Sequence, residues 1–223
     1  MMTFFEKLIS ETAAEKNYLL SAPIIKRCFE GEIALDDYVA FLGQAFHHVK
    51  HTVPLLMNLG AKLPHSQEWL RDAVAEYIEE ELGHQEWILN DIAACGFDKE
   101  AVRNSMPLFE TELMVSYAYD TINRIEPVAF FGMVHVLEGT SVAIADLAAA
   151  TIKDKLSLPN NAFSYLRSHG SLDQEHVKFF ETLMNRIDDE KQQDAIIHAA
   201  KRFYVLYGNI FRALDQARLQ QVA

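Results

Sequence analysis

The chain has 223 residues, of which 50% are hydrophobic and 23% are charged, and this composition is that of a globular protein and argues against disorder. Glycine (9) and proline (6) are sparse, so long helices are favoured over a fold of strands and turns. The net charge of −12 would repel a polyanion, which excludes nucleic acid as an expected partner.

The same sequence indicates a reducing, aqueous compartment. Cys28 and Cys95 form no CxxC pair and are expected to be reduced thiols. The N-terminus is amphipathic and acidic, unlike a signal peptide. The most apolar stretch, 127–150, contains ionisable residues such as Glu138 and Asp146, so we expect no membrane span. These features predict a cytoplasmic protein.

Apolar residues recur at helical spacing along nearly the whole chain, and no strand-like alternation persists. Pro54 is expected to kink one of these helices, and Ser171, with Gln174 as its capping-box partner, to begin another. No repeat, low-complexity segment or linker divides the sequence. The chain is therefore predicted to be one all-α domain, 1–223, with about seven or eight helices. In chain order, the expected helices are 3–16, 23–31, 36–59, 66–95, 106–124, 127–156, a short piece at 162–169, 171–185 and 188–219.

The first candidate metal-binding pattern is His169, Asp173 and His176. At helical spacing these three positions fall on one face, and two imidazoles with a carboxylate suit Fe(II), Mn(II) or Zn(II). The alternative is an exposed polar helix start, because Gly170 and Ser171 could break the helix.

The second candidate is Glu138, which lies in a segment that is apolar on nearly all sides. A carboxylate in such a core helix must be paired, protonated or bound to a metal, because an isolated buried charge is very costly. No Lys or Arg lies within four residues of it. A long-range salt bridge, or an exposed position, remains the alternative.

The third candidate is the pair Glu81 and His84, spaced as Glu-x-x-His. This motif recurs in helical bundles that bind two metal ions through carboxylates. Acidic runs are more often solvated helix faces, and Glu80 or Glu76 could serve in place of Glu81.

Together the three patterns supply three imidazoles and three carboxylates from separate helices. Three carboxylates leave one positive charge uncompensated on two ferrous ions, whereas a single zinc ion would need only three or four of these groups. The pattern therefore favours two iron ions, with manganese or zinc as substitutes. The predicted ligands are Glu81, His84, Glu138, His169, Asp173 and His176.

These motifs resemble the heme-oxygenase-like superfamily and, within it, the diiron oxidases and oxygenases. The resemblance covers about 38–207 and includes the early-helix segment Tyr38-Val-Ala-Phe-Leu-Gly-Gln44 besides the three ligand patterns. It also extends to TenA-type and PqqC-type proteins, which share the fold. The resemblance implies a helical bundle whose six ligands hold two irons that activate dioxygen.

The sequence departs from several relatives at named positions. Some diiron members place the first glutamate seven residues before the histidine, where this chain has Tyr77. TenA-type thiamin hydrolases need a cysteine on the helix that here carries Glu138, and an aspartate where this chain has Ala45. Heme oxygenases need a histidine near the N-terminus, but the first one here is His47. Thiamin-fragment hydrolysis and heme degradation are therefore disfavoured.

The resemblance implies an oxidoreductase that uses O₂ to oxidise a small organic molecule by C–H cleavage, decarboxylation or N-oxygenation, with an external electron donor as a further partner. Glu138 and Tyr165 are the candidate catalytic residues, and a homodimer is expected because relatives form one. The alternatives are a metal-independent enzyme, either a TenA-like hydrolase or a PqqC-like cofactor-free oxidase, and a non-catalytic ligand-binding protein.

Further tyrosines and histidines are candidates for the wall of the substrate pocket. His47 and His51 are also spaced like a metal-binding pair. The alternative for the whole set is ordinary core or surface packing with satisfied hydrogen bonds. Its members are Tyr117, Tyr119, Tyr165, Tyr204, Tyr207, His47, His48 and His51.

Overall fold

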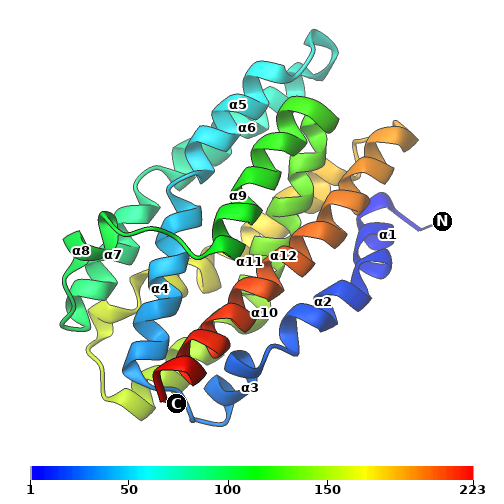
Figure 1. Cartoon of the computed structure of the whole chain (residues 1–223). Helices are drawn as coiled ribbons and strands as arrows, with labels where there is room; N and C mark the ends of the chain where they lie inside the picture. The colour runs from blue at the N-terminus through cyan, green and yellow to red at the C-terminus, as the bar shows by residue number, and fades with distance from the viewer. Residues whose placement is uncertain (1, 223) are drawn as a thin grey trace.

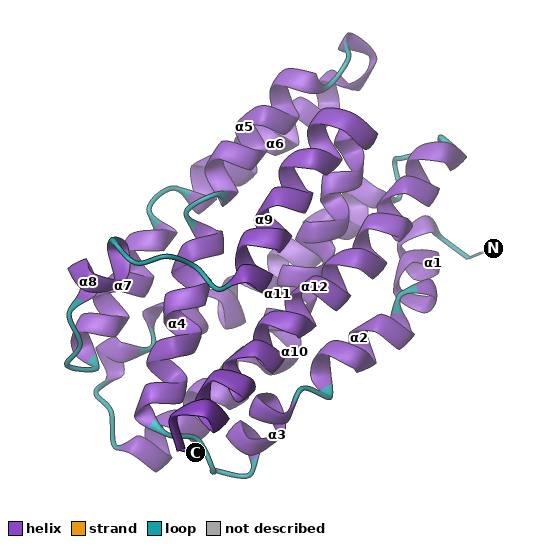
Figure 2. Ribbon diagram, viewed as in Figure 1, coloured by secondary structure: helices purple, strands orange, loops and turns teal. Residues whose placement is uncertain are grey.

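The computed structural model describes the backbone of residues 2–222 and their side chains, except those of 169–176 and 217–222. Within this part of the chain all regular structure is helical (Figure 2). Long helices run side by side along an elongated bundle (Figure 1). The predicted all-α class is confirmed. The structure has more helices than the predicted seven or eight, because several expected long helices are divided.

The N-terminal segment forms α1 (Phe4–Glu11) and α2 (Ala13–Leu20) instead of the single helix expected over 3–16. The division falls at Thr12, whose hydroxyl donates a hydrogen bond to the Leu8 carbonyl at 2.7 Å. Thr3 and Glu6 form a capping box at the start of α1. After α3 (Pro23–Phe29), the chain turns back into the bundle. Both α2 and α3 pack against the last helix, α12 (Glu190–Val222).

The kink expected at Pro54 is instead a complete break three residues earlier. Helix α4 (Leu35–Val49) ends before Lys50, and α5 (Thr52–Lys62) begins after His51. Pro54 therefore lies in the first turn of α5, where a residue without an N–H group is tolerated. The break turns α5 to pack against α6 (Glu68–Glu81), while α4 packs against α7 (His84–Ala94).

The helix predicted over 66–95 is also divided, after the short 3₁₀ turn η1 (His65–Gln67) that precedes it. Gly83 has a φ of +90°, a left-handed conformation that L side chains rarely adopt. Helix α6 ends at Glu81 on one side of this glycine, and α7 begins at His84 on the other. The proposed Glu-x-x-His motif therefore spans a break between two helices and does not lie on a single helix.

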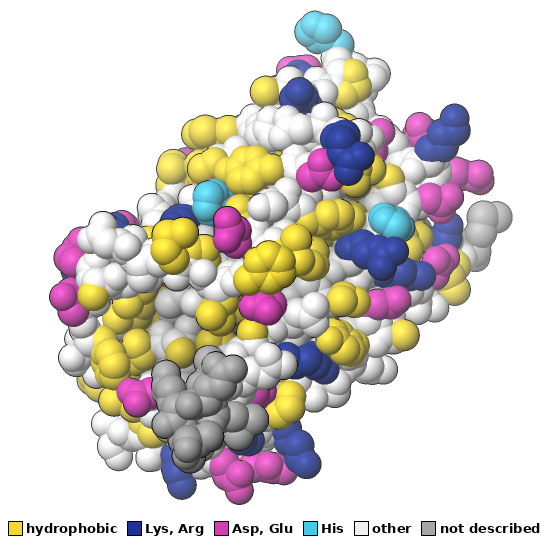
Figure 3. Space-filling model, viewed as in Figure 1, with side chains coloured by type: hydrophobic (Ala, Val, Ile, Leu, Met, Phe, Trp, Pro, Cys, Tyr) yellow, Lys and Arg dark blue, Asp and Glu magenta, His cyan; other side chains and the backbone are white. Residues whose placement is uncertain are grey.

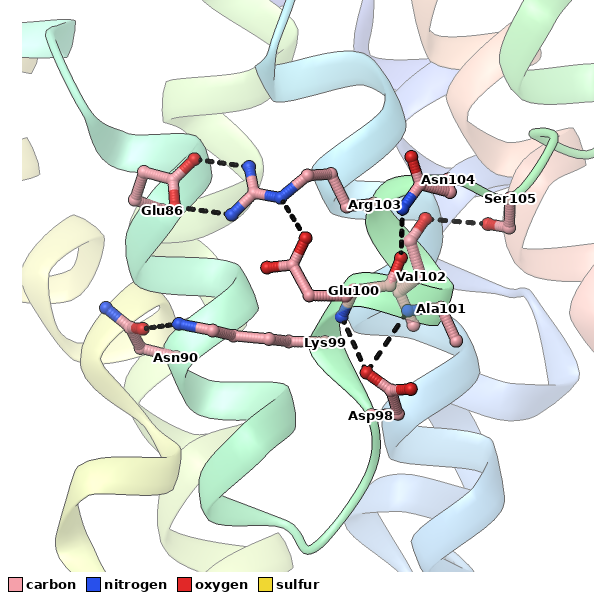
Figure 4. Close-up of polar contacts among 10 residues, drawn as sticks. All are labelled: Glu86, Asn90, Asp98, Lys99, Glu100, Ala101, Val102, Arg103, Asn104 and Ser105. Carbon is pink, nitrogen blue, oxygen red and sulfur yellow. Dashed lines mark hydrogen bonds and ion pairs between the residues drawn. The ribbon is translucent and has the colours of Figure 1, made fainter.

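A short helix that the sequence did not predict, α8 (Lys99–Arg103), braces α7 (Figure 4). The Arg103 guanidinium donates two hydrogen bonds to the Glu86 carboxylate, at 2.7 and 2.9 Å. Lys99 donates a third bond to Asn90 on the same helix, at 3.0 Å. Asp98 caps α8 by accepting from two of its first backbone N–H groups. These contacts hold the solvent side of the helix that starts with His84.

Helix α9 (Phe109–Asp120) continues into a π-helical turn, η2 (Thr121–Ile125), and a 3₁₀ turn, η3 (Pro127–Phe130), leads into α10 (Phe131–Leu156). The segment Pro127–Leu156 is long and apolar enough to cross a membrane, with a mean hydropathy of 1.6. However, 56% of its most apolar window is buried by other helices, as in the core helix of a bundle. Both α11 and α12 pack directly against α10.

Gly132 lets α10 approach α12 closely. A Cβ atom at this position would lie 2.6 Å from the backbone nitrogen of Ala200 and 2.8 Å from the carbonyl oxygen of Ile196. Neither backbone atom can move without displacing its helix. A glycine at this crossing therefore sets the spacing between the two longest helices of the core.

After the 3₁₀ turn η4 (Asn160–Ala162), helix α11 (Ser164–Met184) runs without the interruption expected near Gly170 and Ser171. The prediction of two separate helices, 162–169 and 171–185, is therefore wrong. Continuous helical backbone places positions 169, 173 and 176 at successive turns of one helix. Helix α11 also packs against α10 and α7.

Charged side chains of both signs are interspersed on the face of the bundle seen in Figure 3. Lys and Arg side chains on this face are dispersed among Asp and Glu and do not gather into a basic patch. This distribution agrees with the acidic composition.

Candidate metal centre

Glu81 and His84 are in direct contact across the break between α6 and α7. The His84 Nδ1 atom lies 2.9 Å from Oε2 of Glu81, and both side chains are largely buried, with exposed fractions of 5% and 19%. The neighbouring Glu80 is exposed. Of the glutamates that the sequence left open, Glu81 is therefore the one whose carboxylate points into the protein beside the histidine.

Glu138 lies in the N-terminal half of α10 and lines a cavity of about 70 Å³ together with Glu81. The cavity also receives the side chains of Tyr165 and Tyr207. Helices α6, α10, α11 and α12 therefore converge on one small space, which we call the central cavity. Apolar side chains close most of its wall, among them Phe130, Met133, Val134, Leu137 and Leu56.

Tyr77 lies one helical turn before Glu81, and its pKa reflects the burial and the negative charge of the central cavity. Burial, followed by the nearby charge of Glu138, raises the pKa of Tyr77 above its ordinary value, and Glu80 and Glu81 add to the rise. The phenol therefore stays protonated, with several carboxylates around it. In the sequence, Tyr77 stood out only as a departure from the spacing of relatives. Its i, i+4 relation to Glu81 was the signal that could have placed it in the cavity wall.

The donor set of the central cavity fits a cation. No Lys or Arg is among the described residues that line it, although two carboxylates face it from opposite helices. Buried carboxylates are stable only when paired, protonated or bound to a metal. Oxygen and imidazole groups together suit iron, manganese or zinc.

Three of the six predicted ligands, His169, Asp173 and His176, lie outside the described side chains. Among the described side chains, no group of three or more potential ligands is close enough to hold a metal ion. The structure thus places His84 in contact with Glu81, and Glu81 and Glu138 in the lining of one cavity, and the role of all three as ligands stays a prediction. Helix α11, which carries the remaining three positions, packs against α10 and α7, which carry Glu138 and His84.

The candidate pocket residues separate into two groups. His48 lines the central cavity and packs edge-on against Tyr207, with 5.7 Å between the ring centroids. By contrast, His47 contacts the Ser105 hydroxyl at 2.9 Å and Lys50 at 3.2 Å. Burial, followed by the charges of Lys50 and His51, lowers the pKa of His47 to about 4.

The remaining candidates do not line the central cavity. His51 contacts the Tyr119 hydroxyl at 3.2 Å, so the spacing of His47 and His51 reflects separate hydrogen bonds. Tyr117 packs against Phe203, with 5.0 Å between the ring centroids. Tyr204 lines a different cavity beside α10. The contacts of His47, His51, Tyr117 and Tyr119 agree with the ordinary structural interpretation of the sequence, in which such residues pack and form hydrogen bonds.

Comparison with known proteins identifies both a family and a fold. Residues 39–208 match the family model described as iron-containing redox enzyme. A protein of unknown function with a heme oxygenase-like fold, from Shewanella denitrificans, is 23% identical and has a TM-score of 0.87, with 97% of this chain and 94% of that chain covered. No curated protein matches the sequence.

Two further solved structures have the same fold at lower identity. A TenA homolog from Pseudomonas syringae pv. tomato has a TM-score of 0.79 at 13% identity, covering 96% of this chain and 93% of that one. Heme oxygenase-1 from Synechocystis, solved with heme, has a TM-score of 0.74 at 10% identity, covering 99% and 96%. The predicted heme-oxygenase-like fold is therefore confirmed.

Proposed function

The chain belongs to the family of iron-containing redox enzymes, and from that premise we propose that it is a non-heme diiron oxidoreductase that uses O₂ to oxidise a small organic molecule. The proposed ligands are Glu81, His84, Glu138, His169, Asp173 and His176. The observation that carries the proposal is the meeting of Glu81 and Glu138, from helices α6 and α10, in one cavity whose described lining holds no Lys or Arg.

Charge balance supports two metal ions rather than one. Glu81, Glu138 and Asp173 would together carry three negative charges, which two ferrous ions exceed by one. Iron bound there would supply one-electron and O₂ chemistry. A carboxylate from a substrate would complete the balance without any further group from the protein.

The residues of the chain itself would orient the ligands and exclude water. Glu81 is close enough to His84 to fix the orientation of its imidazole ring. Phe130, Met133 and Leu137 close the cavity with apolar surface. Tyr165, the candidate catalytic tyrosine, contributes to the wall beside Glu138, where it could donate a hydrogen bond or a proton to the reacting molecule.

Metal analysis tests this proposal. The wild-type chain, reconstituted anaerobically with Fe(II), should bind about two irons per chain. Glu138→Ala and His176→Ala should lose most of that iron. Glu79→Ala is the matched control, because Glu79 belongs to the same acidic run as Glu81 but is exposed. Equal iron contents in all four proteins would end the proposal.

Oxygen uptake by the iron-loaded protein separates an enzyme from a binding protein. Uptake that needs iron, a reductant and Glu138 supports the oxidoreductase. A metal-independent enzyme of the TenA or PqqC kind would instead retain its activity after chelation. Iron binding without uptake would favour a non-catalytic ligand-binding protein.

A further inference from the structure

A second and larger cavity lies on another side of Glu138. It has a volume of about 210 Å³ and is bounded by α1, α2, α10, α11 and α12. Glu138 lines both this cavity and the central one, so its side chain stands where the two spaces meet. Ile9 and Val142, which are 48% and 41% exposed, lie on its rim, so the cavity reaches the surface.

The two cavities differ in volume, and only the second one is large enough for an organic ring. A cavity of about 150 Å³ accommodates benzene, and the second cavity is larger than that, at about 210 Å³. The central cavity, at about 70 Å³, has room for metal ions and their small oxygen ligands but not for a ring. An organic molecule that reacts at the central cavity therefore needs the second one.

The Tyr204 hydroxyl is a hydrogen-bonding group inside the second cavity. The Thr12 hydroxyl donates to the Leu8 carbonyl at 2.7 Å, so towards His135 Nε2, 3.4 Å away, it can only accept. The Tyr204 hydroxyl lies 3.5 Å from the same nitrogen, and which of the two groups donates depends on the tautomer of His135. When Nε2 carries the hydrogen, the Tyr204 hydroxyl can donate to a ligand in the cavity.

A positive charge stands beside this donor. Lys16 lines the cavity, is half-buried, and makes no ion pair with any described residue. Its charge reaches the interior, because burial and then Lys16 lower the pKa of His135 to about 4. Phe5 and Phe180 supply apolar surface next to the His135 ring, with centroid separations of 6.4 and 5.9 Å, and they also contact each other edge to face at 6.0 Å.

We propose that this second cavity binds the organic substrate and that its ligand is a small aromatic monocarboxylate, held by Lys16 and the Tyr204 hydroxyl with its ring against the apolar surface of Phe5 and Phe180. The role as substrate site rests on the proposed function, whereas binding of the anion does not. With metal bound, the charge of Glu138 would be compensated, so the anion would bind more tightly than to the metal-free chain.

A third cavity, of about 80 Å³, offers a contrast. It adjoins the central cavity through Ser141, Tyr165 and Tyr207, which line both. Its described lining includes no Lys, Arg or His, and its one carboxylate is Asp37. An anion would meet no positive charge there, so this cavity does not fit the same ligand.

Calorimetric titration with benzoate, on the full chain with and without iron, tests the inference. Lys16→Met should raise the Kd for benzoate at least tenfold, while Lys7→Met, which removes an exposed charge on α1, should leave it unchanged. Benzamide, the neutral analogue of benzoate, should bind more weakly and should not respond to Lys16→Met.

Steric variants locate the site. Gly139 lines the second cavity, and a Cβ atom there would lie 3.8 Å from the Tyr204 hydroxyl, so Gly139→Leu should fill the space and abolish benzoate binding. Ala148→Leu, which fills the third cavity, should not change it. Benzoate binding that is indifferent to Lys16→Met, or that is lost in Ala148→Leu and kept in Gly139→Leu, would overturn the inference.

Thermal unfolding of each variant separates lost binding from lost folding, and Lys16→Met keeps the test decisive because its side chain is only half-buried. Failure of the two proposals can also be told apart. A chain that binds benzoate through Lys16 but takes up no iron keeps the binding site and loses the diiron function. A chain that binds two irons but binds no benzoate through Lys16 keeps the diiron function and loses the proposed binding site.

Discussion

Asp91, on α7, accepts a hydrogen bond from the backbone N–H of Tyr165, on α11, at 2.9 Å. The same carboxylate accepts from the backbone N–H of Ser164 at 3.0 Å and is completely buried. Asp91 thus caps the N-terminus of α11 from a distant part of the chain. The contact joins the helix that begins at His84 to the helix that carries positions 169, 173 and 176.

Removing this carboxylate should destabilise the fold. Asp91→Ala would leave the buried N–H group of Tyr165 and the partly buried N–H group of Ser164 without this acceptor, and we expect the free energy of unfolding to fall by about 2–3 kcal/mol. Asp98→Ala is the control, because Asp98 also accepts from two N–H groups, at the exposed start of α8, and its loss should cost about 1 kcal/mol. Urea denaturation measures both, and equal losses would contradict the argument.

The left-handed glycine between Glu81 and His84 offers a second test. Gly83→Ala should cost about 1–2 kcal/mol because an L side chain is strained at a φ of +90°. Gly31→Ala should cost about as much, since Gly31 has a φ of +71° and, like Gly83, open space around its Cβ position. Only the change at Gly83 should also weaken iron binding, because it moves Glu81 relative to His84.

Iron content measured after equilibrium dialysis, together with urea denaturation, separates the two effects. If both glycine variants lost iron equally, the loss would follow stability alone. In that case the turn at Gly83 would have no special part in orienting the Glu81 and His84 side chains.

The elements predicted best from the sequence were those with one strong local signal. Helix α10 and the half-buried position of Glu138 followed from an apolar segment around this carboxylate and from Pro127 at the start of the segment. Nothing local predicted the cap on α11, because Asp91 and Tyr165 are 74 positions apart. The sequence pattern placed a break and a new N-cap at Ser171, whereas α11 runs without interruption from Ser164.

The breaks within long helices were harder to predict, because they also depend on contacts between residues far apart in the sequence. A glycine in a helical pattern is often tolerated, so Gly83 alone did not indicate whether the helix would continue. The conformation at Gly83 lets α7 turn away from α6 and pack against α4. Contact between Glu81 and His84 was expected from helical spacing, and it is made through a turn instead.

Buried histidine makes stability depend on pH. His135 has a pKa of about 4 in the folded chain, lowered chiefly by burial, against about 6.5 for an exposed histidine. The unfolded chain therefore binds more protons between these values, so stability falls as the pH drops from about 6.5 towards 4. The contribution of this one group is on the order of 3 kcal/mol at most.

The His135→Phe variant should flatten the pH dependence of the unfolding free energy in that window, since phenylalanine can pack against Phe5 and Phe180 without titrating. The control is His65→Phe, because the His65 side chain is fully exposed. Urea denaturation at several pH values measures the slope. An unchanged slope in His135→Phe would assign the acid sensitivity to other groups.

Trp87 should report metal binding directly. Its ring centroid lies 4.1 Å from that of His84. The other tryptophan, Trp69, lies on α6 and packs against the guanidinium group of Arg186. Anaerobic titration with Fe(II) should therefore quench the fluorescence of the wild-type chain, and of Trp69→Phe, because the indole of Trp87 would lie next to a ligated imidazole. Trp87→Phe should lose most of the change. Glu138→Gln should lose it too while retaining both tryptophans, because the metal then lacks a ligand from α10. Quenching of equal size in Trp87→Phe would mean that iron binds away from His84.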